Sequence, residues 1–143
     1  MSDAAAIPKA VDIQARRAHL TVQAAPGDNR DYIATLSGNL VGTSFGLTSV
    51  GVEVRYVPDR FVTRLGDFQT YLAYLDKFGF EHLETVGAIL RDDFANVLIG
   101  KWTQVTITGT APGRIGLMEH VVVMEDRRPK WNNKTLMDRV KLR

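Results

Sequence analysis

The chain of 143 residues contains no cysteine. This absence excludes disulfide bonds, thiolate metal ligands and a cysteine nucleophile, and it fits a cytoplasmic protein, which is the location we expect. Long apolar runs are also missing, because none approaches the roughly 20 residues of a membrane-spanning helix. Neither charge is in large excess, since 18 lysines and arginines face 16 aspartates and glutamates. We therefore expect no membrane partner, and composition alone does not indicate nucleic acid.

Histidines are few, and the common cofactor motifs are absent. The three histidines, His19, His82 and His120, lack the close helical spacing of a zinc site, so we expect no metal. The loop Gly42–Gly46 lacks the strand–loop–helix context of a phosphate-binding or dinucleotide-binding loop. Met1–Pro8 carries no basic region followed by an apolar stretch, so we expect no secretory signal.

The length and composition fit one globular domain with flanking segments. The apolar share of 45% and the charged share of 24% are ordinary, and the chain is long enough for one core. We divide it into a flexible leader or N-terminal arm (1–30), a folded domain (31–125) and a basic C-terminal tail (126–143). Within the first part, Val11–Val22 is compatible with a strand or a short arm. We expect the tail to be loosely held.

Four segments of the domain have the patterns of strands. They are Asp31–Val41, Ser49–Pro58, Lys101–Thr110 and Arg114–Glu125. The signal is clearest in the second, where Val52, Val54 and Tyr56 alternate with polar residues or glycine. The short turn Ala111–Gly113 between the last two segments predicts a hairpin.

Two segments between these strands have the patterns of helices. Asp67–Phe78 carries apolar residues at helical spacing, with Asp67 as the predicted N-cap and Gly79 as the predicted stop. Glu81–Val97 carries one long apolar stripe. The order strand, strand, helix, helix, strand, strand (ββααββ) predicts an α+β domain, in which two helices pack on one face of an antiparallel sheet.

Short motifs fall on these elements in a consistent order. They are Tyr56-Val57-Pro58-Asp59 after the second strand, Asp67 through Tyr71-Leu72 in the first helix, Phe80-Glu81-His82-Leu83-Glu84 at the start of the second helix, and Asp92 within it. Together with the element order, they resemble the tunnelling-fold (T-fold) superfamily. Within it the nearest likeness is to the nitrile reductases of the queuosine pathway, over roughly Leu40–Met118.

The likeness fails at the residues that carry the reaction of that family. Counted without gaps from Tyr56, the catalytic cysteine of the nitrile reductases falls on Val41, and their catalytic aspartate falls on Thr48. A valine cannot attack a nitrile to form a thioimide, so we expect no nitrile reduction. The family's Arg-Gly-Gly, which contacts the cofactor phosphate, has only a distorted counterpart at Gly113–Gly116. We therefore expect no cofactor.

The resemblance still implies an assembly and a site. T-fold subunits join into barrels with pockets between subunits, which implies a homo-oligomer here. In the family a glutamate near the start of this helix anchors a planar ring, and either Glu84 or Glu81 would match it. His82 matches the family histidine and would move a proton. Arg114 is a candidate for binding an anionic part of a substrate.

Each of these residues also has a purely structural interpretation. Glu81 and Glu84 could stabilise the first turn of the helix, His82 could be a surface residue and Arg114 could be solvated. His120 lies on the last strand beside Glu119, and the two side chains face opposite ways.

Our leading hypothesis is a cysteine-independent T-fold enzyme of a biosynthetic pathway. It would act on a planar or carbonyl-bearing metabolite by non-covalent acid/base chemistry: cyclisation, isomerisation, aldol-type cleavage or hydrolysis. The first alternative is a non-catalytic T-fold scaffold or heterocycle-binding protein. A second alternative is a nucleic-acid binder that uses the basic tail.

Overall fold

The computed structural model describes residues 12–27, 30–41, 47, 49–78 and 80–140. Its main element is a four-stranded sheet with the spatial order β2–β3–β5–β6, and all neighbouring pairs are antiparallel. The strands are β2 (Ala34–Leu40), β3 (Ser49–Val57), β5 (Trp102–Pro112) and β6 (Leu117–Arg127). The predicted α+β class and its antiparallel sheet are confirmed.

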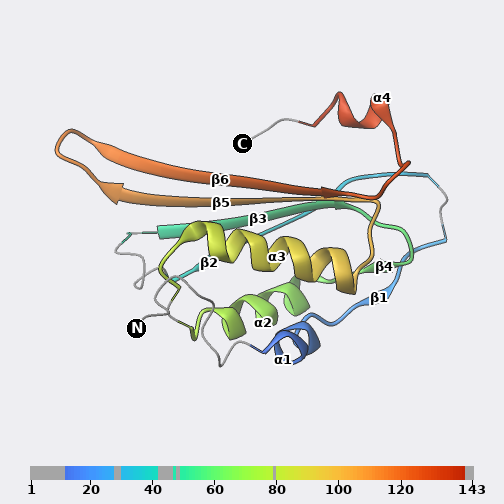
Figure 1. The fold of residues 1–143 in the computed structure, drawn as a ribbon, viewed down its shortest axis with the longest axis horizontal. Coiled ribbons are helices and arrows are strands. Elements are labelled where there is room, and N and C mark those ends of the chain that lie inside the picture. Colours follow the sequence, from blue (N-terminus) through green and yellow to red (C-terminus); the bar gives the residue numbers. More distant parts are fainter. Residues whose placement is uncertain (1–11, 28–29, 42–46, 48, 79, 141–143) are drawn as a thin grey trace.

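Two helices lie side by side against one face of this sheet (Figure 1). α2 (Leu65–Leu75) packs against β2, and α3 (Leu83–Val97) packs against β5 and β6. Phe68 of α2 and Phe94 of α3 are each 1% exposed, and their rings meet edge to face with centroids 5.9 Å apart. The apolar stripes that predicted the two helices therefore meet in one core.

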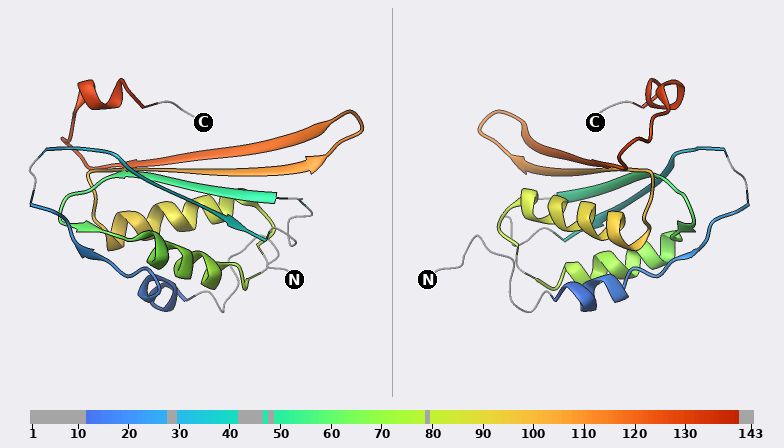
Figure 2. Two further views of the ribbon diagram at one scale, coloured as in Figure 1. Left: turned by 180° about the vertical axis from the view of Figure 1, so that it is seen from behind. Right: turned by 45° about the vertical axis from the view of Figure 1, so that its right-hand side comes forward.

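The sheet contributes the alternate residues of its strands to this core. Val54 of β3 is fully buried, and it lies in register between Leu36 of β2 and Val105 of β5. Because side chains alternate along a strand, Glu53 points to the opposite face, with Thr106 of β5 beside it. This opposite face, called the polar face below, carries polar residues over β2, β3 and the middle of β5, and Val121 and Val123 of β6 border them. The C-terminal segment with α4 (Lys134–Met137) runs on its side of the sheet (Figure 2).

The N-terminal segment forms a short helix, α1 (Ile13–Ala18), so the strand that was one interpretation of Val11–Val22 is wrong over these residues. Asp12 caps the helix, because its carboxylate accepts a hydrogen bond from the N–H of Ala15 at 3.3 Å. The chain then forms a two-stranded ribbon that no sequence pattern predicted. Its strands are β1 (Gln23–Ala24) and β4 (Phe61–Val62).

Several boundaries differ from the sequence-based prediction. α2 begins at Leu65 with Arg64 as its N-cap, so Asp67 lies in the first turn and accepts a hydrogen bond from Gln23 instead. β5 continues to Pro112, and the hairpin turn lies between that residue and Leu117. Gly116 supplies a φ of 71° in this turn, which glycine adopts at little cost. The predicted helix stop Gly79 lies outside the described residues.

The C-terminal segment is tied to the domain. The indole N–H of Trp131 donates a hydrogen bond to Asp31 at 3.0 Å, and the side-chain amide of Asn133 donates to the same carboxylate oxygen at 3.2 Å. Arg128 donates to Asp59 at 3.0 Å. The described part of the tail is therefore not loosely held, in contrast to our expectation.

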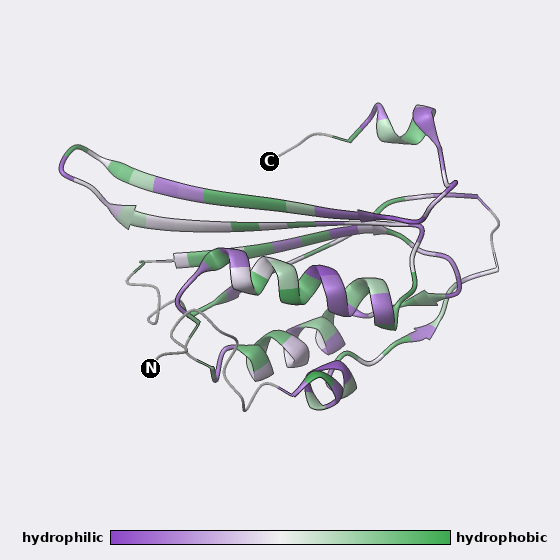
Figure 3. Cartoon of the chain, in the orientation of Figure 1, coloured by the Kyte–Doolittle hydropathy of each residue, from purple (hydrophilic) through white to green (hydrophobic). Residues whose placement is uncertain are grey.

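The hairpin of β5 and β6 extends beyond the helices, and its free end carries apolar residues (Figure 3). Ile115 is 96% exposed, Leu117 is 77% exposed and Met118 is 58% exposed. Among the described residues, no helix has the length and apolar character needed to cross a membrane.

Candidate functional site

Three of the predicted site residues line one hollow at the N-terminal end of α3. Glu81, His82 and Glu84 all border it, and its volume is about 210 Å³. The remaining lining residues are Leu83, which lies between His82 and Glu84, and Leu47 and His120 from other parts of the chain. The hollow thus brings two carboxylates and two imidazoles together over a partly apolar floor.

One polar contact in this hollow joins a strand to a helix. His120 Nε2 of β6 lies 3.6 Å from Glu84 Oε2 of α3, within the range of an ion pair when the imidazole is protonated. The two side chains are 55% and 57% exposed. The pair is therefore accessible to a solute, and it can both hold and exchange a proton.

Local structure explains why these side chains are available. His82 is the N-cap of α3 in an extended conformation, but its side chain makes no capping hydrogen bond. Glu84 lies in the first turn, where the positive end of the helix dipole favours a carboxylate. Neither side chain is needed to close the helix through a side-chain cap.

A glycine opposite His120 shapes the floor of the hollow. Gly109 of β5 lies in register with His120, and a Cβ at this position would be 2.6 Å from Leu47 Cδ1 and 3.1 Å from Leu83 Cδ1. The missing side chain therefore lets the two leucines pack against the strand. Their packing places an apolar surface next to the acidic and imidazole groups.

Arg114 does not belong to this group. It lies exposed in the turn of the β5–β6 hairpin and does not line the hollow. His120 is the fourth polar member instead, and the sequence contained a signal for it. Read with period two, His120 shares a strand face with Val122 and Met124, and this face points to the helices.

The positions where the resemblance failed lie elsewhere. Val41, where the nitrile reductases carry their cysteine, is 65% exposed beyond the end of β2. Its backbone N–H donates to the carboxylate of Asp76 at 3.0 Å. Thr48 and the loop Gly42–Gly46 lie outside the described residues.

The most strongly perturbed titratable groups are in the core. Asp93 is fully buried and accepts hydrogen bonds from Arg16, Arg17 and the Tyr71 hydroxyl. Burial, together with the negative charge of Asp93, raises the pKa of Tyr71 well above its ordinary value. This cluster is closed to a substrate and its hydrogen bonds join helices, so we assign it to stability.

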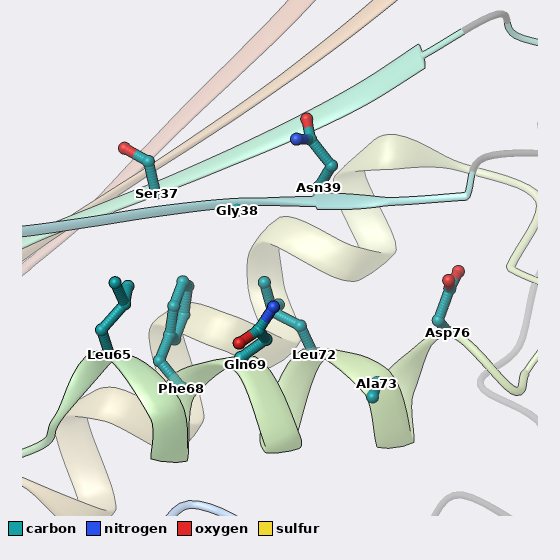
Figure 4. A pocket seen from close by; sticks show the side chains of 9 residues that line it. All are labelled: Ser37, Gly38, Asn39, Leu65, Phe68, Gln69, Leu72, Ala73 and Asp76. Atoms are coloured by element: carbon teal, nitrogen blue, oxygen red, sulfur yellow. The ribbon is translucent and has the colours of Figure 1, made fainter.

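A larger cleft separates β2 from α2 (Figure 4). Its volume is about 320 Å³, and Phe68 and Leu72 point from α2 toward the strand. Among the described residues that line the cleft, Asp76 is the one carboxylate and none is a histidine, and Asp76 already accepts the N–H of Val41. The cleft therefore offers less chemistry than the hollow at α3.

No metal cluster accompanies either site. Within the part of the chain that the structure describes, no three histidine, aspartate or glutamate side chains gather closely enough to hold an ion. The comparisons with known proteins found no family model and no curated protein that matches this chain.

Proposed function

We propose that this chain is a small-molecule enzyme of the T-fold type that works by non-covalent acid/base chemistry. The observation that carries the proposal is the contact between Glu84 and His120, with His82 and Glu81 on the same hollow. Two imidazoles beside one ligand can donate and accept protons near neutral pH. The substrate would be a planar or carbonyl-bearing metabolite.

In this proposal the carboxylates hold the ligand and the imidazoles transfer protons. Glu84 or Glu81 accepts hydrogen bonds from the N–H groups of the ligand, as a carboxylate can from an amidine-like edge. His82 moves a proton, and Glu84 orients His120 for the same task. The reaction is a cyclisation, isomerisation, aldol-type cleavage or hydrolysis. Without any cysteine, a covalent thioimide route is closed.

The arrangement of elements supports the T-fold part of the proposal. The main sheet follows the chain order β2, β3, β5, β6, and α2 and α3 intervene between β3 and β5. An edge strand can pair with another chain, and β6 lies at an edge of the main sheet. The side chains of Val121 and Val123 on β6 are each more than a third exposed. We therefore propose a cytoplasmic homo-oligomer whose pockets lie between subunits, with residues of a neighbour completing each hollow.

A second candidate is a non-catalytic T-fold scaffold or heterocycle-binding protein. The observation that favours it is the exposure of Glu84 and His120, each more than half accessible. Water weakens electrostatic interactions in such an open site, so proton transfer gains less there than in a closed one. Binding of a heterocycle by Glu84 needs no such enclosure.

The test is a thermal-shift screen of the full chain against purines, pterins, deazapurines and small keto acids. A ligand at a hundredfold excess over its Kd should add about 2.7 kcal/mol of stability. Glu84→Gln should abolish the shift, because the amide is a poorer acceptor of two parallel N–H groups. Glu119→Gln is the matched control, since Glu119 lies beside His120 on β6 but faces the opposite way.

Turnover of the ligand then separates the two candidates. If His82→Ala removes turnover but keeps the thermal shift, the chain is an enzyme. If the wild-type protein binds the ligand without converting it, the binding protein is the right assignment. If no ligand class shifts the wild type, or if Glu84→Gln and Glu81→Gln both behave as wild type, the proposed site is wrong.

A further inference from the structure

A separate hollow lies on the polar face of the sheet, opposite the helices. Its volume is about 340 Å³. Its floor is a grid of two rows across β2, β3 and β5, in which each row contains residues in register. The first row is Ser37, Glu53 and Thr106, and the second is Asn39, Gly51 and Thr108. This floor shares no residue with the hollow at α3.

The glycine in the middle of the second row is not required by the packing of the chain. A Cβ on Gly51 would have only Asn39 Oδ1 and the Thr108 carbonyl oxygen near it, each at 3.8 Å, which is ordinary contact. Among the described glycines only Gly116 has a positive φ, so backbone conformation does not demand glycine at 51 either. Glycine inside a strand is unfavourable, and it often marks a close approach by a ligand.

A buried hydroxyl near this glycine has no partner among the described residues. Thr106 is 3% exposed, and its Oγ1 makes no hydrogen bond to any described residue. Gln104, two residues away on the same face of β5, is equally buried, and its Oε1 is unpartnered among the described residues too. Buried polar atoms in folded proteins almost always have partners. The polar face thus presents unmet hydrogen-bonding capacity next to an unfilled space.

The lining groups define the chemistry that would fit. The hydroxyls of Ser37, Thr106 and Thr108 and the amide of Asn39 can each both donate and accept. Glu53, the one carboxylate, lies 3.3 Å from Arg55 Nε, so its charge is already balanced. Among the described residues that line the hollow, none is a lysine, an arginine or an aromatic residue. This set disfavours phosphates and flat aromatic rings, and it favours an uncharged ligand with several hydroxyl groups.

We propose that this hollow binds a small uncharged polyol of about monosaccharide size, seated over Gly51 with a hydroxyl bonded to Thr106. The volume is at the lower end of that of small-molecule pockets. Glu53 can accept two adjacent hydroxyls of such a ligand, as carboxylates do. The inference does not depend on the proposed function, because the two hollows use different residues.

The test titrates the ¹⁵N-labelled full chain with D-glucose, D-ribose and myo-inositol at millimolar concentrations. At least one should shift the backbone amides of residues 37–39, 51–53 and 106–108. Gly51→Ala should weaken this binding about tenfold, because its methyl group occupies the floor. Gly66→Ala is the matched control, since a Cβ there meets no atom within 4 Å and lies on α2, away from the hollow.

A second variant separates binding from folding. Thr106→Val keeps the shape of the side chain and removes the unpartnered hydroxyl. It should therefore raise the melting temperature and weaken polyol binding. Glu84→Gln should leave the titration unchanged. The proposal is overturned if none of the three polyols shifts these amides, or if Gly51→Ala keeps wild-type affinity. It is equally overturned if Gly51→Ala changes the oligomeric state in light scattering, which would assign the hollow to a neighbouring copy.

Discussion

Arg16 Nε lies 2.7 Å from Asp93 Oδ2, and both side chains are buried. The contact fixes α1, at the start of the described chain, to α3. Asp93 lies 77 residues after Arg16 in the sequence. Arg17 adds a second bond to the other carboxylate oxygen at 2.9 Å, and the Tyr71 hydroxyl joins from α2. One carboxylate therefore connects three helices, and its donors satisfy both of its oxygens.

Asp93→Asn should destabilise the protein by about 3–5 kcal/mol, because it leaves the buried guanidinium of Arg16 without a compensating charge. Urea unfolding followed by circular dichroism measures this loss. Asp92→Asn is the control, since Asp92 is 51% exposed and its pair with Arg91 contributes at most about 1 kcal/mol. Equal effects of the two substitutions would contradict the role that we give to Asp93.

The Tyr71 hydroxyl should make the protein sensitive to alkali. Burial and the neighbouring Asp93 raise its pKa in the folded state well above the unfolded value of 10.0. The folded state therefore holds this proton more tightly, so its contribution is complete below pH 10 and is lost as the pH rises further. Tyr71→Phe should reduce the slope of stability against pH above 10, whereas Tyr74→Phe on the same helix should not. Parallel alkaline slopes in both variants would argue against this role of Tyr71.

The sequence predicted the elements with strong periodicity and missed those without it. The alternation around Val54 and the apolar stripes of α2 and α3 are local signals, so both sets of elements appear where expected. β1 and β4 have two residues each, which is too short for any pattern. The helix α1 is held by a partner 77 residues away, and no local signal reveals such a partner.

The candidate site shows the same division. Glu81, His82 and Glu84 are neighbours in the chain, so their common hollow followed from their positions around the helix start. His120 reaches them only through the pairing of β5 with β6. The predicted turn at Ala111–Gly113 would have ended β5 too early, whereas the strand continues to Pro112. The residue that contacts Glu84 therefore depended on a register that composition does not determine.

Asp31 should control the C-terminal segment in acid. Burial alone would raise the pKa of this carboxyl, but hydrogen bonds from Lys101, Asn133 and Trp131 outweigh it and lower the pKa below 3.8. The resulting stabilisation is present above pH 3.8 and is lost as the pH falls through the lowered value. The indole N–H resonance of Trp131 should therefore shift in acid as its bond to Asp31 weakens.

Asp31→Asn should reproduce the acid state at neutral pH. The loss of a charged acceptor for three donors should cost about 1.5–3 kcal/mol and should speed amide exchange in residues 133–140. Asp59→Asn is the matched control, because Asp59 also binds the segment through Arg128 but is 38% exposed. Protected amides in Asp31→Asn would show that packing alone holds the segment.

Two glycines of the sheet should respond oppositely to alanine. A Cβ on Gly38 would lie 2.7 Å from Leu72 Cδ1 in the core, so Gly38→Ala should cost about 1–3 kcal/mol by overpacking. A Cβ on Gly51 meets nothing closer than 3.8 Å, so Gly51→Ala should be neutral or stabilise by up to about 1 kcal/mol. Thermal denaturation of both variants measures these changes in stability. A clear loss in Gly51→Ala would mean that glycine is needed there for folding.

The contact between Glu84 and His120 should matter little for stability, whatever it does for a ligand. Both side chains are more than half exposed, so a double-mutant cycle with Glu84→Gln and His120→Gln should give a coupling below about 1 kcal/mol. Glu84→Gln alone should lower the free energy of unfolding by about 0.3–1 kcal/mol, because the first turn of α3 loses a favourable charge. Both variants should thus remain folded at the temperature of any binding assay. A coupling of several kcal/mol would make the pair a structural bridge between α3 and β6, and it would remove the reason to assign these exposed groups to chemistry.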